Sequence, residues 1–125
     1  MTTLSQGKLM AFVATADGAR ARAFYETTLG LRVLSDDDFA LALDAGGTML
    51  RVQKVAHFTP HPFTALGWQV ADLEGEVQRL SAAGVAFQRY PGLQQDGRGI
   101  WQSPSGARVA WFHDPDGNTL SLTAF

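Results

Sequence analysis

The chain has no cysteine among its 125 residues, and this absence removes several kinds of chemistry. Disulfides, thiolate metal sites and cysteine nucleophiles are all excluded, because each of them needs a thiol. The chain also has no excess of positive charge, with 10 Lys and Arg against 12 Asp and Glu. Nucleic acid is therefore not an expected partner, since binding to it depends on clustered basic side chains.

Long hydrophobic runs are lacking as well. No apolar stretch approaches the roughly 18 residues that a membrane-spanning helix needs, so no membrane partner is expected. The polar start TTLSQ has neither the charged region nor the apolar core of a signal peptide. We therefore expect a cytoplasmic protein. With 46% hydrophobic residues, residues 1–125 are long enough to form one domain with its own core.

One pattern occurs twice along the chain. Each copy begins with a predicted strand, at residues 8–14 and 64–70, and a helix comes after each strand. Asp17 and Asp72 stand where helix N-caps are expected, because their carboxylates can accept a hydrogen bond from the first helical turn. Gly30 and Gly84 stand where the helices are expected to end.

Further strands with turn signals between them come after each helix. They are expected at residues 31–34, 39–43 and 48–54 in the first copy, and at residues 85–89, 99–102, 108–113 and after Asn118 in the second. Residues 57–62 hold two prolines and are interpreted as the linker. The predicted fold class is α+β, with two tandem βαβββ modules at about residues 7–55 and 64–123.

Two stretches and the repeat suggest a family. The stretches are ARAFYETTLGLRV, shortly after Asp17, and DPDGNTLSL near the end. Together with the repeated βαβββ pattern, they resemble the vicinal oxygen chelate superfamily, which includes glyoxalase I, extradiol dioxygenases and the fosfomycin- and bleomycin-resistance proteins. The resemblance covers Gly7 to Thr123. It implies that the two mixed sheets curve into a cup with the helices outside, and that the protein pairs as a homodimer.

The resemblance also indicates where metal-dependent relatives carry their His, Gln or Glu ligands. By spacing, the four positions fall on Met10, Arg51, Ala65 and Ser121. A methyl group and a guanidinium cannot hold a divalent cation, and a thioether is a poor ligand for the hard or borderline ions of this fold. We therefore expect no metal and no cofactor.

Strand alternation predicts which side chains face a ligand. Leu50, Val52, Leu120 and Leu122 suit a face that packs beneath helices, whereas the polar residues between them fall on the opposite face. The expected partner is a small molecule, anionic or rich in carbonyl groups. The candidate ligand-binding residues are Met10, Phe12, Arg51, Gln53, Gln69, Trp101, Trp111 and Ser121.

Alternatives stay open at this point. Arg51 either recognises an anionic ligand, because its planar fork suits carboxylate and phosphate, or it pairs with a nearby carboxylate such as Asp44. The leading function is a metal-free, bleomycin-resistance-like binding protein. The alternative is a metal-independent enzyme (lyase, isomerase or dioxygenase-related), with Arg51 stabilising charge and His113 or a tyrosine transferring the proton. A third possibility is an interaction module whose cup is filled by its own side chains.

Overall fold

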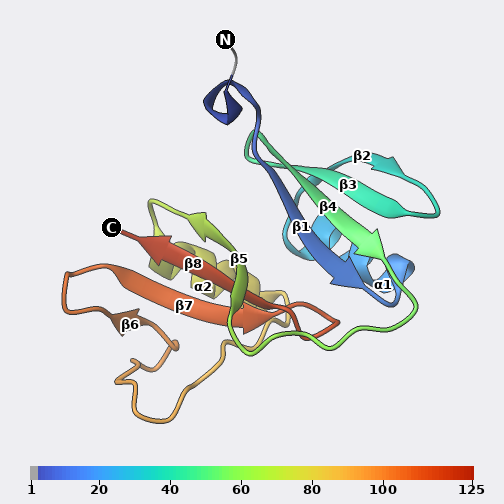
Figure 1. Ribbon diagram of the computed structural model, residues 1–125. Helices are drawn as coiled ribbons and strands as arrows, with labels where there is room; N and C mark the ends of the chain where they lie inside the picture. Colours follow the sequence, from blue (N-terminus) through green and yellow to red (C-terminus); the bar gives the residue numbers. More distant parts are fainter. Residues whose placement is uncertain (1–2) are drawn as a thin grey trace. The chain divides into compact units, whose positions relative to one another are not determined.

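Two four-stranded mixed sheets, each with its own helix, make up the computed structural model, which describes residues 3–125 (Figure 1). The first unit ends at Thr59 and the second is Pro60–Phe125. Each unit has a strand, a helix and three further strands, so the predicted α+β class with two βαβββ modules is confirmed. In each sheet the first strand runs parallel to the last, and the other neighbours are antiparallel.

The strands of the two sheets have these bounds. The first sheet has the order β1 (Met10–Thr15), β4 (Thr48–Lys54), β3 (Ala40–Ala45) and β2 (Arg32–Asp36). The second has the order β5 (Thr64–Gln69), β8 (Thr119–Ala124), β7 (Arg108–His113) and β6 (Trp101–Gln102). A short 3-10 turn, η1 (Leu4–Gln6), precedes β1.

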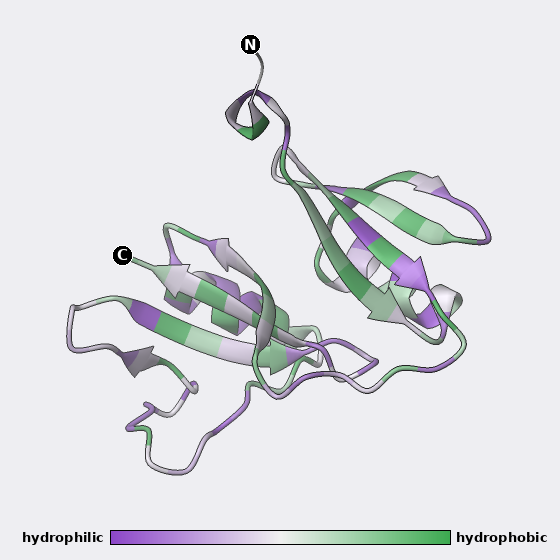
Figure 2. Ribbon diagram, viewed as in Figure 1, coloured by the Kyte–Doolittle hydropathy of each residue, from purple (hydrophilic) through white to green (hydrophobic). Residues whose placement is uncertain are grey.

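One face of each sheet is buried against the helix of its own unit. In the first unit α1 contacts β3 and β4, and in the second α2 contacts β7 and β8. Hydropathy alternates along these strands, as β4 and β7 show in Figure 2. The fully buried strand residues include Leu41, Leu43, Leu50 and Val52 in the first unit and Ala110, Phe112 and Leu120 in the second. The alternation predicted for β4 and β8 therefore has its physical basis in these two cores.

The helices begin and end where the sequence predicts. Asp17 accepts a hydrogen bond from Arg20 N at 3.1 Å, and Asp72 accepts one from Gly75 N at 3.1 Å. Gly30 and Gly84 both have positive φ, at 76° and 94°, which glycine adopts without the steric cost of a side chain. Neither helix of the described chain combines the length and the apolar character that a membrane crossing needs.

The two helices differ in regularity. α2 (Leu73–Ala82) is an α-helix throughout, whereas α1 (Gly18–Arg22) continues as a π-helical segment, η2 (Ala23–Thr28). The wider turn is visible in the hydrogen bond from Leu29 N to Phe24 O, which spans five residues. The sequence pattern predicted a single helix here and did not reveal this change.

The turn before β8 is fixed by one buried carboxylate. Asp114 Oδ1 accepts hydrogen bonds from Asp116 N at 3.0 Å and Asn118 N at 2.9 Å, and Oδ2 accepts one from Asn118 Nδ2 at 2.9 Å. Gly117 takes a φ of 90° inside the turn. The DPDGN motif is thus explained by local backbone geometry, as expected of an Asp-Pro…Gly turn.

The predicted strand at residues 85–89 is wrong. Only Phe87 pairs there, in an isolated bridge to Phe112, and the strand expected at 99–102 is reduced to the two residues of β6. β6 pairs with β7 only at Arg108 and Val109, and Phe87 meets the same edge further along, at Phe112. Residues 85–89 thus contribute a single bridge to this edge and form no ladder of pairs.

Candidate functional site

The open face of the first sheet is the face turned away from α1, and four of the predicted residues belong to it. Phe12 lies beside Arg51 in the parallel pairing of β1 with β4, and Met10 and Gln53 precede and follow this pair by two residues along their strands. Phe12 is 50% exposed and Met10 41%. Because side chains alternate along a strand, these four side chains share one face, as the sequence predicts.

Arg51 is half-buried on this face and faces Ala42 on the neighbouring strand β3. None of the ion pairs formed within residues 3–125 includes Arg51. On one side Arg51 has the small residue Ala42, and on the other it has the large ring of Phe12. Arg51 therefore presents its charge between an alanine and an exposed aromatic ring.

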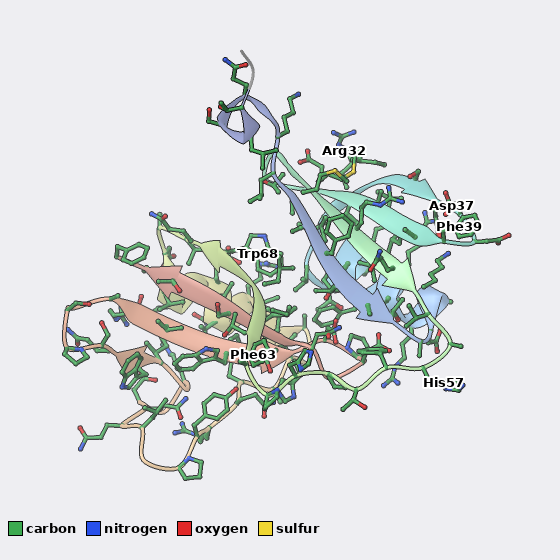
Figure 3. The ribbon with its side chains drawn as sticks, viewed as in Figure 1. Arg32, Asp37, Phe39, His57, Phe63 and Trp68 are labelled. Atoms are coloured by element: carbon green, nitrogen blue, oxygen red, sulfur yellow. The ribbon has the colours of Figure 1, made fainter. Side chains whose placement is uncertain are left out.

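The alternative pairing of Arg51 with Asp44 is not what the structure shows. Asp44 Oδ2 instead accepts a hydrogen bond from Arg32 Nη2 at 3.3 Å, and Oδ1 accepts one from Gly47 N at 2.8 Å. Arg51 interacts electrostatically with another carboxylate, that of Asp37, at the turn between β2 and β3 (Figure 3). Hydrogen bonds from the backbone of Ala40 and Phe39 lower the pKa of Asp37, and the charge of Arg51 lowers it further.

The open face of the second sheet carries an aromatic cluster. The rings of Trp101 and Trp111 lie 5.9 Å apart between centroids, and Tyr90 meets Trp111 edge-to-face at 5.4 Å. Trp111 pairs with Ser121, and Trp101 pairs with Val109. Gln69, at the far edge of the sheet on β5, pairs with Thr123 and is exposed. Trp68 precedes Gln69 on β5 and pairs with Leu122, so strand alternation places its side chain on the opposite face.

Ser121 and Thr119 are more enclosed than the sequence suggests. Ser121 is 8% exposed and Thr119 5%, because β8 lies in the middle of the sheet between β5 and β7. Ser121 lies directly beside Gly67, and a Cβ at Gly67 would come within 2.6 Å of the Ser121 hydroxyl. Only glycine at position 67 fits beside the serine without displacing it. The hydroxyl row thus packs closely within the sheet at Ser121 and becomes half-exposed at Thr123.

Tyr90 was missed by the sequence analysis. It lies in a segment with no regular structure and reaches Trp111 through the fold of that segment, which no strand periodicity reveals. Burial raises the pKa of the Tyr90 phenol. The phenol is therefore neutral near pH 7 and a poor general base, which counts against a tyrosine at this position as a proton acceptor.

The four positions where metal-dependent relatives are expected to carry ligands all lie on strands. Met10 and Arg51 belong to the first sheet, and Ala65 and Ser121 to the second, where Ala65 is the residue skipped in the pairing of β5 with β8. Within residues 3–125, no three His, Asp or Glu side chains are grouped as a metal ion would need. The donor set at these four positions, a thioether, a guanidinium, a methyl group and a hydroxyl, does not fit a divalent cation.

Comparison with known proteins agrees with this architecture. The family model described as the Glyoxalase/Bleomycin resistance protein/Dioxygenase superfamily matches residues 8–122. No curated protein sequence gives a significant match.

Among solved structures, similar folds include three bacterial proteins. A protein from Bacillus anthracis assigned to the glyoxalase family is 19% identical, with a TM-score of 0.76 over 99% of this chain and 98% of that one. A lactoylglutathione lyase from Agrobacterium tumefaciens is 16% identical, with a TM-score of 0.72 over 94% and 93% of the two chains. A fosfomycin resistance protein from Listeria monocytogenes is 14% identical, with a TM-score of 0.76 over 96% and 93%. These structures share the fold, and the family model that spans residues 8–122 shows that the chain belongs to the glyoxalase/bleomycin resistance protein/dioxygenase superfamily.

Proposed function

We propose that the chain is a metal-free binding protein for a small organic molecule that is anionic or rich in carbonyl groups. The observation that carries this proposal is Arg51. Its charge lies on the open face of the first sheet, beside the exposed ring of Phe12, and no carboxylate of residues 3–125 forms an ion pair with it. A guanidinium in such a place suits a carboxylate, a phosphate or a pair of carbonyl oxygens.

The open face of the second sheet supports the same proposal through different chemistry. Trp101 and Trp111 offer aromatic surface with indole N–H donors, and Gln69 offers an exposed amide. Binding sites for small molecules combine apolar and aromatic surface with a few polar groups that fix orientation. Taken by itself, the second sheet therefore offers aromatic surface with a few polar groups, a character that suits a small organic molecule.

A panel of ligands in matched pairs tests this proposal. Aromatic and aliphatic carboxylates are compared with their primary amides and with ammonium compounds of the same size, by thermal unfolding. A ligand that binds the folded state raises the melting temperature, so carboxylates or dicarbonyl compounds should do so and ammonium compounds should not. The shift should vanish in Arg51→Met and persist in Arg20→Met, which removes an exposed charge from α1. Preferential stabilisation by cations would contradict the proposal.

The absence of a resident metal is a separate part of the proposal. Purified protein should carry no stoichiometric Zn²⁺, Ni²⁺, Mn²⁺ or Fe²⁺, because the four expected ligand positions hold unsuitable donors. Elemental analysis that found one tightly bound ion per chain, retained when His57 and His61 are both changed to Ala, would contradict it. Turnover that survives exhaustive chelation and disappears in Arg51→Met would instead support the metal-independent enzyme.

We further propose that the protein works as a homodimer. Leu9, Met10 and Phe12 are exposed at or just before β1, which is an edge strand of its sheet. Exposed apolar side chains at an unpaired sheet edge favour association, and small soluble oligomers are most often twofold-symmetric dimers. Sedimentation at tens of micromolar should give twice the mass of the chain, and a monomer there would contradict the proposal.

A further inference from the structure

The second unit has a pocket of about 330 Å³ on the helix side of its sheet, between α2 and the segment after it. This segment runs from the end of α2 to β6, in gold and orange in Figure 1. The pocket is lined by Val77, Gln78, Ser81, Phe87, Arg89, Gly97, Arg98 and Gly99. Phe87 packs on Phe112, which belongs to the buried face beneath α2, so the pocket lies on the opposite side of this sheet from Trp101 and Trp111.

The wall of the pocket beyond α2 is not a strand, and side-chain hydrogen bonds, along with the isolated bridge between Gln95 and Trp101, hold it in place. Gln95 donates hydrogen bonds through Nε2 to Gln88 O at 2.9 Å and Gly99 O at 2.8 Å, and its Oε1 accepts one from Tyr90 N at 2.8 Å. Asp96 Oδ1 accepts hydrogen bonds from the backbone of Arg98 and Ile100, both at 2.9 Å. These bonds fix the segment that carries both arginines of the pocket.

The charges that line the pocket are both positive. Arg89 uses one nitrogen, Nη2, to donate to Asp96 O at 2.5 Å, and a guanidinium has five N–H donors, so most remain for a ligand. The Arg98 side chain forms no ion pair within residues 3–125. The lining residues, all from the described part of the chain, include no carboxylate.

Two carboxylates near the pocket have partners other than the pocket arginine side chains. Asp96 accepts its two backbone hydrogen bonds, and Glu74 forms an ion pair with Arg108. The hydrogen bond from Arg108 lowers the pKa of Glu74, and the more distant charge of Arg98 contributes to the same effect. Neither carboxylate forms an ion pair with Arg98 within residues 3–125.

We infer that this pocket binds a small phosphomonoester with an apolar or aromatic body. A phosphomonoester carries close to two negative charges near pH 7, which matches the two guanidiniums, and arginine is well suited to phosphate geometry. Gln78 and Ser81 add neutral hydrogen-bonding groups from α2, while Val77 and Phe87 provide apolar surface. The volume of 330 Å³ falls within the range of small-molecule sites and leaves room for a body beyond the phosphate.

Glycine at two positions opens the pocket to a ligand. Gly97 and Gly99 line it without side chains, and a Cβ at Gly99 would come within 3.2 Å of the Phe87 Cβ. Gly99 also has a φ of 89°, which L side chains rarely adopt. Because both glycines line the pocket, the NMR signals of their backbone amides should respond to a phosphate bound there.

Phenyl phosphate is the probe for this inference, monitored through the backbone amide signals of Gly97 and Gly99 in two-dimensional NMR. Saturable shifts at these amides are expected with phenyl phosphate, weaker binding with benzoate, and none with benzyl alcohol, its neutral counterpart. Inorganic phosphate tests the head group alone and should bind more weakly than phenyl phosphate. Benzyl alcohol that shifts the same amides as strongly as phenyl phosphate would overturn the inference.

Two variants test the pocket, one by removing a charge and the other by filling the space. Arg98→Met removes one guanidinium and should weaken phenyl phosphate at least tenfold, while Ser81→Trp keeps both arginines and should block the pocket sterically. Arg79→Met is the matched control, because it also replaces an arginine by methionine. Arg79 lies on α2, pairs with Glu76 and does not line the pocket. Equal weakening in Arg79→Met and Arg98→Met would overturn the inference, as would unchanged binding in Ser81→Trp.

Arg51→Met separates this inference from the proposed function. Arg51 belongs to the first unit and does not line this pocket, so the variant should leave the shifts at Gly97 and Gly99 unchanged. If Arg51→Met abolishes them and Arg98→Met does not, phenyl phosphate binds at the open face and the pocket is not a phosphate site.

Discussion

The two modules share one order of elements and differ in the segment after the helix. In the first, the chain leaves Gly30 and forms the regular strand β2, Arg32–Asp36. The next strand of the first module, β3, begins at Ala40. In the second module the chain leaves Gly84 and reaches the corresponding strand, β7, only at Arg108, with the two residues of β6 on the way. The longer segment carries Tyr90, Arg89 and Arg98. The repeated strands thus form the scaffold, and the unrepeated segment carries the additional candidate binding groups.

The modules also differ where β1 meets β4 and β5 meets β8. Phe12 lies beside Arg51 in the first sheet, and Gly67 lies beside Ser121 in the second. A large exposed ring with a charge thus corresponds to a glycine with a buried hydroxyl. The same strand arrangement therefore carries a charged residue on one open face and closely packed residues on the other. Variants at corresponding positions can compare how much each module contributes to stability.

The largest effects are expected in the two cores. Leu50 and Leu120 are fully buried at corresponding places on the central strands β4 and β8. Leu50→Ala and Leu120→Ala should each lower the free energy of unfolding by about 2–5 kcal/mol, because each leaves a cavity that its neighbours cannot fill. Denaturant unfolding measures both values. A cost under about 1 kcal/mol in either module would show that its core is not packed as described.

The hairpin turns should differ in sensitivity. Asp114→Ala leaves two backbone N–H groups of its turn without their acceptor and should cost about 1–3 kcal/mol in unfolding free energy. Asp44→Ala loses one hydrogen bond and an exposed ion pair with Arg32, and should cost less than about 1 kcal/mol. Thermal unfolding of both variants at neutral pH tests this order. Equal costs would remove the distinction between the turns.

Gly67 and Phe12 provide a sharper contrast. Gly67→Ala places a methyl carbon against the Ser121 hydroxyl and should cost about 1–2 kcal/mol, as overpacking does. The double variant with Ser121→Ala should recover much of this loss, because the clashing oxygen is gone. Phe12→Ala removes a half-exposed ring and should cost less. A double variant no more stable than Gly67→Ala alone would contradict the proposed contact.

The smallest effect concerns acid stability. A hydrogen bond from Lys54, at 2.5 Å, lowers the pKa of Asp36 below its ordinary 3.8, and Arg22 adds to the effect. A carboxylate with a lowered folded-state pKa stabilises the protein above its ordinary value, and this stabilisation is lost as the pH falls through the folded pKa. Asp36→Asn should therefore be less stable than wild type at pH 6, and the difference should shrink as the pH falls through the lowered folded-state pKa of Asp36. A gap that persists in acid would contradict this linkage.

The sequence predicted the strands and helix boundaries well, because these depend on local rules. Alternation placed β4 and β7 at their observed residues, and Asp17, Asp72, Gly30 and Gly84 marked the helix boundaries through capping and positive φ. Residues 85–89 were mistaken for a strand because their apolar content is strand-like, whereas the course of the chain past the edge of β7 allows only one bridge, from Phe87 to Phe112. That course is a tertiary effect, and a local pattern does not contain it.

The candidate sites were predictable only in part, for the same reason. Parity along the strands placed Arg51 and Phe12 on one face, and the structure shows them side by side. Tyr90 and the pocket arginines Arg89 and Arg98 depend on the course of an irregular segment that Gln95 and Asp96 hold in place. No periodicity marks such residues, so they appear only when the fold is known.

The proposed role of Arg51 is tested most directly by calorimetric titration of the carboxylate that stabilises the wild type best, with Arg51→Met and Arg20→Met as variants. Loss of a charge-assisted hydrogen bond should weaken binding to Arg51→Met by about 1.5–3 kcal/mol, or roughly ten- to a hundredfold, with little change in melting temperature. Arg20→Met should bind as wild type does. Unchanged affinity in Arg51→Met together with a lowered melting temperature would contradict the account, because Arg51 would then be a structural residue of the sheet.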